Sequence, residues 1–78
     1  MKTADEIREA VIHSIKKVTS RDDVMLENGG LFEDYALDSL DRMSIMIEVE
    51  IQLKVDFDDL DPGELNCIND YITCVQKL

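Results

Sequence analysis

Hydrophobic residues recur with a helical period over the first periodic segment, Thr3–Val18. Thr3 with Glu6 three residues later forms a capping-box pattern. Lys16 and Lys17 fall in the last turn, where cations suit the negative end of the helix dipole. This pattern predicts a helix whose buried face carries Ile7, Ala10, Val11, Ser14, Ile15 and Val18.

A second helical period begins at Asp38 and runs to Leu53. Asp38 is a good N-cap residue, and Asp41 adds a carboxylate in the first turn. The apolar side is wide enough to face two neighbours, which is typical of a central bundle helix. Its predicted stripe is Met43, Met46, Ile47, Glu50 and Ile51, widened by Val49 and Leu53.

A third periodic segment, Cys67–Lys77, predicts a last helix capped by Asn66. Its apolar face combines Ile68, Tyr71, Ile72 and Val75. Before it, Asp59–Leu65 contains Pro62-Gly63 and predicts a short third helix or turn.

Residues 19–37 form a long connection rich in turn formers. Its apolar residues predict that it packs on the helices, with Leu31 and Phe32 as anchors. We therefore expect one domain over residues 1–78, an all-α four-helix bundle with a long first loop and a short third helix.

The negative charge is concentrated in the middle of the chain. The formal net charge is −10; residues 1–32 carry five basic and six acidic side chains, whereas residues 33–64 carry eleven acids against Arg42 and Lys54. Such a segment repels phosphate backbones and attracts basic protein surfaces. We expect protein partners with basic patches, no nucleic acid, no membrane, and a monomer.

The cysteines and the single histidine offer little chemistry. Within one helix, Cys67 and Cys74 would lie about 10.5 Å apart, too far for a disulfide. Unbridged thiols suit a reducing compartment, and no secretory signal follows Met1, so we expect a cytoplasmic protein. His13 lies off the apolar stripe and has no second histidine to join it.

An enzyme is the weakest interpretation, because no base, nucleophile or metal set forms a catalytic constellation. The acidic segment 56–64 does not fit a calcium loop. Its oxygen ligands, glycine and glutamate do not fall at EF-hand spacing. No metal site is predicted.

The most informative stretch is LFEDYALDSLD, residues 31–41. Asp38-Ser39-Leu40 stands at the start of a predicted helix, preceded by Glu33-Asp34 and followed by Asp41. Together with the chain length, the preceding helix and the long loop, this pattern resembles the attachment site of the acyl carrier protein family, freestanding and phosphopantetheine-dependent. The resemblance spans essentially the whole chain.

The resemblance implies that Ser39 is esterified to 4′-phosphopantetheine, transferred from coenzyme A by a phosphopantetheinyl transferase. The thiol of this arm would carry an acyl group as a thioester. Such a carrier presents its cargo to acyl-loading, condensing and modifying enzymes of fatty acid, specialised lipid or polyketide biosynthesis. The position also makes physical sense, since free N–H groups at a helix start favour a phosphodiester.

Further roles follow from the same resemblance. Asp38, Asp41 and Arg42 would contact partners, Leu40 would stand exposed beside the arm, and Glu48 and Glu50 would extend an acidic docking face. The interior, which in this family admits an acyl chain, would be lined by Met43, Met46, Ile47, Leu53, Phe57, Leu60, Leu65 and Ile68.

Several residues depart from the pattern of familiar fatty-acid carriers. Ala36 replaces a glycine, Ser44 and Ile51 replace frequent acids, and Arg42 stands at an often uncharged position. We therefore hypothesise a dedicated carrier of a specialised pathway whose partners recognise Arg42 and Ile51.

Two other binding functions remain open. A peptidyl or aminoacyl carrier has the same fold and arm, but more often has glycine and histidine before the serine, where this chain has Leu37-Asp38. An unmodified acidic interaction domain is the other alternative, in which Ser39 merely caps a helix.

Overall fold

The computed structural model describes residues 2–57 and 60–78, which contain three α-helices and two short 3₁₀ helices and no strand. In chain order they are α1 (Ala4–Thr19), η1 (Phe32–Tyr35), α2 (Ser39–Leu53), η2 (Pro62–Glu64) and α3 (Ile68–Gln76). The all-α prediction is confirmed. The count of four helices is not, because the expected third helix is the single 3₁₀ turn η2; Asp59, its expected start, lies outside the described residues.

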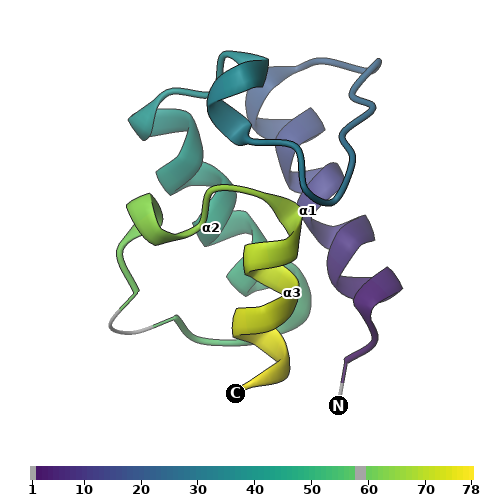
Figure 1. Cartoon of the computed structure of the whole chain (residues 1–78), viewed down its shortest axis with the longest axis vertical. Coiled ribbons are helices and arrows are strands. Elements are labelled where there is room, and N and C mark those ends of the chain that lie inside the picture. Colours follow the sequence, from purple (N-terminus) through teal and green to yellow (C-terminus); the bar gives the residue numbers. More distant parts are fainter. Residues whose placement is uncertain (1, 58–59) are drawn as a thin grey trace.

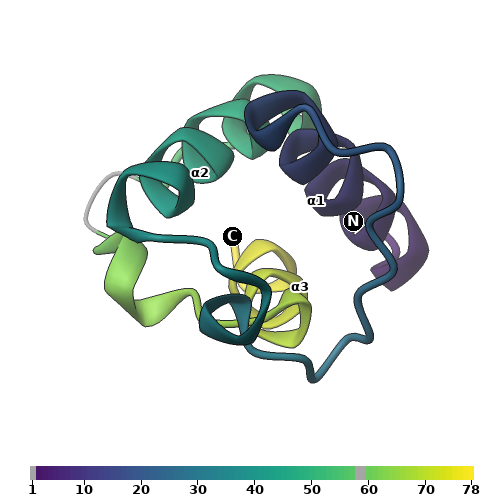
Figure 2. The ribbon, with the colours of Figure 1, turned by 90° about the horizontal axis from the view of Figure 1, so that it is seen from above.

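The three helices surround a common core (Figure 1). α1 packs against both α2 and α3, and η2 packs against α2. Seen from above, α1 and α2 lie along one side of the bundle and α3 along the other (Figure 2). The Gln76 side-chain amide donates to the Lys2 carbonyl at 3.5 Å, so the two ends of the chain lie close together.

Helix α1 matches its prediction closely. The Thr3 hydroxyl accepts from the Glu6 amide at 3.1 Å, and the helix ends at Ser20 in the left-handed conformation. The polar Ser14 is fully buried, but its hydroxyl donates to the Ala10 carbonyl and accepts from Gln52 of α2 at 3.0 Å. Because this hydroxyl is satisfied, its burial costs little.

Helix α2 has the predicted bounds but not the predicted buried face. Its buried residues are Ile45, Val49 and Leu53, spaced at i, i+4 and i+8. Of the expected interior positions on the predicted stripe, Met43 and Ile47 are each 49% exposed, so their placement in the interior was wrong. The helix is apolar on two sides, and periodicity alone does not say which side faces the core.

The long connection, residues 19–37, packs on the helices as predicted, but one of its two predicted anchors is exposed. Phe32 is 1% exposed and its amide donates to the Asn66 carbonyl at 2.8 Å. Leu31 is 41% exposed, so it was wrongly expected as an anchor; Leu26 and Leu37 are buried instead.

Helix α3 buries Ile68, Tyr71 and Val75, as its pattern predicts. The Tyr71 ring contacts those of Phe32 and Phe57, each with centroids 6.0 Å apart. The predicted Asn66 cap was wrong: Cys67 is the N-cap residue, without a side-chain cap bond. The Asn66 side chain accepts from an arginine of α2 instead.

Candidate functional site: an exposed serine at the start of α2

Ser39 is the first residue of α2 and is exposed. The N-cap position belongs to Asp38, whose carboxylate accepts from the Asp41 amide at 2.9 Å. Within residues 2–57 and 60–78, the Ser39 hydroxyl makes no hydrogen bond. The interpretation of Ser39 as a helix-capping serine was therefore wrong, and its hydroxyl is accessible to a modifying group.

The chain reaches Ser39 along a well-anchored path. η1 ends at Ala36, which adopts the left-handed conformation with φ of 60°. This backbone conformation is one that glycine adopts more easily, so an alanine here carries modest strain. The next residue, Leu37, is buried and its amide donates to the Phe32 carbonyl at 3.3 Å. Ser39 is thus placed by a short segment fixed at both ends.

Carboxylates lie close to Ser39 in the chain. Glu33, Asp34 and Asp38 are exposed, and Asp41 is half-buried in the first turn of α2. Asp61 lies across from Ser39 on the η2 side, with its carboxylate accepting from the Gly63 amide at 2.8 Å. These acids offer a basic protein several charged contacts around the serine.

A small crevice opens next to Ser39, between α2 and η2. It has a volume of about 170 Å³ and is lined by Ser39, Arg42, Met43, Asp61, Pro62 and Gly63. This volume is similar to that of cavities that hold a benzene-sized group.

Arg42 is directed into the bundle and not towards solvent. Its Nη2 donates to the carbonyls of Pro62 at 3.2 Å and Leu65 at 3.3 Å, and to Asn66 Oδ1 at 2.5 Å. Its Nε is buried and has no partner among the described residues. Its guanidinium is therefore occupied in joining α2 to the segment around η2.

The two acids expected to extend the docking face are also engaged within the molecule. Glu48 pairs with Lys17 of α1 at 3.1 Å, and its side chain is only 20% exposed. Glu50 accepts from the Phe57 amide at 3.0 Å. Neither carboxylate projects freely from the outer side of α2.

Four apolar side chains project from α2 into solvent. Leu40, Met43, Ile47 and Ile51 are 74%, 49%, 49% and 64% exposed. Their spacing of three, four and four residues places them on one helix face. We call these four residues the outer α2 stripe. Both this row and the buried row of Ile45, Val49 and Leu53 have a helical spacing, so the sequence does not indicate which of them is exposed.

The remaining residues expected to line an acyl pocket do lie in the protein interior. Leu53, Phe57, Leu65 and Ile68 are buried, and Met46 and Leu60 are partly buried against the same core.

Other potentially reactive groups lie away from Ser39 or are unactivated. Both cysteines are free and half-buried, and burial, with Asp70 nearby, raises the pKa of the Cys74 thiol. His13 is exposed. No group of three or more His, Cys, Asp or Glu residues in the described chain is arranged to hold a metal ion, and no described helix is long and apolar enough to cross a membrane.

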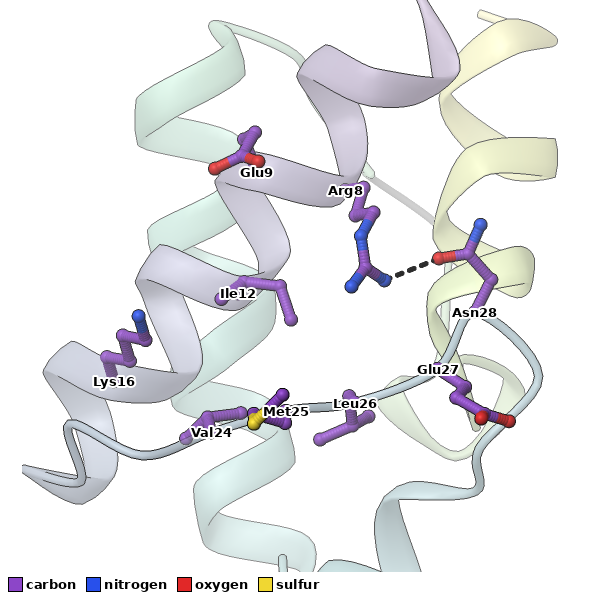
Figure 3. A pocket seen from close by; sticks show the side chains of 9 residues that line it. All are labelled: Arg8, Glu9, Ile12, Lys16, Val24, Met25, Leu26, Glu27 and Asn28. Carbon is purple, nitrogen blue, oxygen red and sulfur yellow. Dashed lines mark hydrogen bonds between the residues drawn. The ribbon is translucent and has the colours of Figure 1, made fainter.

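A larger groove of about 810 Å³ lies on the opposite flank, between α1 and residues 24–28 (Figure 3). The Arg8 guanidinium donates to Asn28 Oδ1 at 2.6 Å across it. The groove is an open surface hollow lined by four charged side chains, four apolar ones and Asn28, and Ser39 is not part of it.

Known proteins similar to this chain share one name. The chain is 26% identical over 78 residues to proteins called acyl carrier protein from Rickettsia typhi, Rickettsia prowazekii and Rickettsia canadensis. Each alignment covers 99% of this chain and 91% of the relative. No family model matches the chain, and no solved structure matches it. Acyl carrier proteins are carriers and not enzymes, and the similarity supports a carrier role.

Proposed function

We propose that this chain is a freestanding acyl carrier protein, a single carrier domain over residues 1–78 that bears 4′-phosphopantetheine on Ser39. The observation that carries the proposal is the exposed hydroxyl at the start of α2, left without a hydrogen bond in the described chain because Asp38 caps the helix. The relatives named acyl carrier protein support the same class.

The surroundings of Ser39 fit a phosphodiester. The first amides of a helix lack intrahelical partners and lie at the positive end of its dipole, which favours an attached anion. In the transfer, the Ser39 oxygen forms the new P–O bond, the pyrophosphate bond of coenzyme A breaks, and the nucleotide part leaves. When attached, the arm supplies a thiol that holds an acyl group as a thioester.

Two surface features would guide partner enzymes to this arm. The acids around Ser39, including Asp38 and Asp41, would contact basic residues of a phosphopantetheinyl transferase and of acyl-loading, condensing and modifying enzymes. The outer α2 stripe would pack against an apolar surface beside those basic residues. Glu48 and Glu50 contribute less than the sequence predicted, since both are engaged within the molecule.

The apolar character of α2 supports a carrier dedicated to a specialised pathway. Ile51 is 64% exposed at a position where the resemblance leads one to expect an acid. A general partner that relies on a basic contact there would find none. Arg42 no longer belongs to this recognition proposal, because its guanidinium is turned towards Pro62, Leu65 and Asn66. The reducing cytoplasm remains the proposed setting.

The test is direct modification. The purified protein is incubated with coenzyme A and a broad-specificity phosphopantetheinyl transferase, and its intact mass is measured. One added arm is expected in the wild type and in Ser44→Ala, a matched control at another exposed serine of α2. Ser39→Ala should gain none. A wild type that stays unmodified beside a positive-control carrier would instead favour an unmodified interaction domain.

A further inference from the structure

Ser39, the proposed site of the arm, lines the crevice between α2 and η2. The crevice runs between the first turns of these two helices, and Arg42 and Met43 form part of its wall. Arg42 also bonds to the Leu65 carbonyl and its charge acts on the Tyr71 hydroxyl, and both Leu65 and Tyr71 are buried. A chain that folded back from the arm by this route would have to pass the Arg42 side chain.

Arg42 spans this path by bonding to three acceptors: the carbonyl of Pro62 on the opposite wall, and the Leu65 carbonyl and Asn66 Oδ1 just after η2 in the chain. One nitrogen, Nη2, joins α2 to the carbonyls of Pro62 and Leu65 and to the Asn66 side chain. Nη2 has two hydrogens for these three acceptors, so at least one hydrogen is shared between two of them.

The acceptors themselves are held firmly. The Asn66 amide donates to Asp70 of α3 at 2.8 Å, and its carbonyl accepts from Phe32. The Arg42 bonds therefore connect α2, η2, the start of α3 and the long connection. Opening the crevice requires these bonds to break together or the whole segment around η2 to move.

The surroundings of Arg42 are also polar for an interior meant to receive an aliphatic chain. The pKa of Tyr71 is raised mainly by burial, and the charges of Arg42 and Glu50 both act on its hydroxyl. A guanidinium, a carboxylate and a phenol thus lie within electrostatic range of one another. An aliphatic chain entering here would remove water from polar groups without offering them a hydrogen bond.

We propose that Arg42 keeps the interior closed to the cargo, so that this carrier holds short or polar acyl groups outside the bundle. This inference rests on the proposed function and names its substrate class. Short or polar groups lose little by remaining in water, whereas the cost of leaving a chain exposed grows with each methylene. Arg42 is thus a residue that determines cargo, and not a contact for partner enzymes.

The experiment compares acetyl and octanoyl groups on the full protein, each attached with the transferase from the corresponding acyl coenzyme A. Amide chemical shifts of Ile68 and Tyr71 report on the interior, and the rate of thioester cleavage by hydroxylamine reports on exposure. In the wild type, octanoyl loading should leave both amides unshifted relative to acetyl loading. The two thioesters should also be cleaved at similar rates.

Arg42→Met removes the bonds but keeps an unbranched side chain suited to a helix. In this variant octanoyl loading should shift the Ile68 and Tyr71 amides. Octanoyl cleavage should slow by about tenfold, the factor expected if the chain spends about nine-tenths of its time inside. Arg8→Met, which removes the remote bond to Asn28, is the matched control and should behave like the wild type. Asn66→Ala, which removes one acceptor, provides a milder second variant.

The outcomes separate the two proposals. If no arm is added to the wild type, the proposed function and this inference both fail. If the arm is added and octanoyl already shifts the interior amides and slows cleavage in the wild type, the carrier function stands and the role of Arg42 is overturned. If octanoyl shifts the interior amides in neither the wild type nor Arg42→Met, another feature closes the interior and the role of Arg42 is also overturned. If Arg42→Met does not fold, Asn66→Ala is used for this comparison.

Discussion

Helices α1 and α2 are similar in length, yet their apolar residues are used differently. In α1 the predicted face is the buried face: Ile7, Val11 and Ile15 are at most 1% exposed. In α2 the core takes Ile45, Val49 and Leu53, and a second apolar row, the outer α2 stripe, remains in solvent. A helix with one apolar side is explained by folding alone. A helix with two apolar sides has more apolar surface than its own core needs, and the proposed docking of partner enzymes would account for the excess.

The largest effect on stability is expected from a pair of substitutions at two isoleucines that lie two positions apart on α2. Ile45 is fully buried and Ile47 is 49% exposed. Ile45→Ala should lower the free energy of unfolding by about 2–5 kcal/mol, because it leaves a cavity in a small core. Ile47→Ala should cost less than about 1 kcal/mol.

Urea unfolding followed by circular dichroism measures both changes. Since a domain of this size has only modest total stability, Ile45→Val, with an expected loss of about 0.5–1.5 kcal/mol, serves as the milder variant. Equal losses for Ile45→Ala and Ile47→Ala would show that α2 does not have an inner and an outer side as described.

The next prediction concerns the outer side at the serine. Leu40 is 74% exposed, so Leu40→Asp should change stability little. It should raise the KM of the transferase for the protein by about tenfold, because a carboxylate pressed against an apolar partner surface loses its water without gaining a hydrogen bond. Initial rates measured against protein concentration check this. The matched control is Met25→Asp, at a residue that is 86% exposed and lines the groove between α1 and residues 24–28. An equal KM for both variants and the wild type would argue against docking through the outer α2 stripe.

The same contrast explains how much could be predicted from the sequence. The bounds of α1 and α2 followed from local signals, namely Thr3 and Asp38 as capping residues and the helical period between them and the next turn. The buried face of α3 also followed, because its apolar residues form a single row. The expected position of Ser39 at a helix start followed from the same local reasoning.

The rest depended on contacts between distant parts of the chain. The buried side of α2 could not be chosen from periodicity, since both of its sides are apolar. Asn66 has the residue type of a helix cap, but its side chain accepts from Arg42, 24 positions away in the sequence. The sequence predicts Glu48 and Glu50 to be free surface acids. The structure shows that Glu48 pairs with Lys17 and that Glu50 accepts from the Phe57 amide. Sequence reasoning located the candidate site but not the fixed arrangement around it.

A smaller effect is expected at the inner edge of α2. Glu50→Ala removes the acceptor of the Phe57 amide, which lies in the segment following α2. Losing a hydrogen bond to a charged group should cost about 1.5–3 kcal/mol if the amide stays buried, and less if water replaces the carboxylate. Glu50→Gln keeps an acceptor oxygen and should cost less than Glu50→Ala. Urea unfolding of both variants tests this order, and a loss in Glu50→Gln as large as in Glu50→Ala would mean that the negative charge matters more than the bond.

The smallest effect on stability is expected for Glu48, whose ion pair with Lys17 joins α2 to α1. The Lys17 side chain is 61% exposed and the pair is open to salt, so Glu48→Gln should lower stability by less than about 0.5 kcal/mol. The difference between variant and wild type should shrink further in about 1 M salt, where charges are screened within about 3 Å.

The same variant also tests which side chains of α2 the transferase contacts. Because Lys17 already neutralises Glu48, the transferase should bind Glu48→Gln as well as it binds the wild type, whereas Leu40→Asp should weaken binding. A clear rise in KM for Glu48→Gln at low salt would show that Glu48 takes part in docking, as the sequence predicted. Charged contacts with partners would then extend along the whole length of α2.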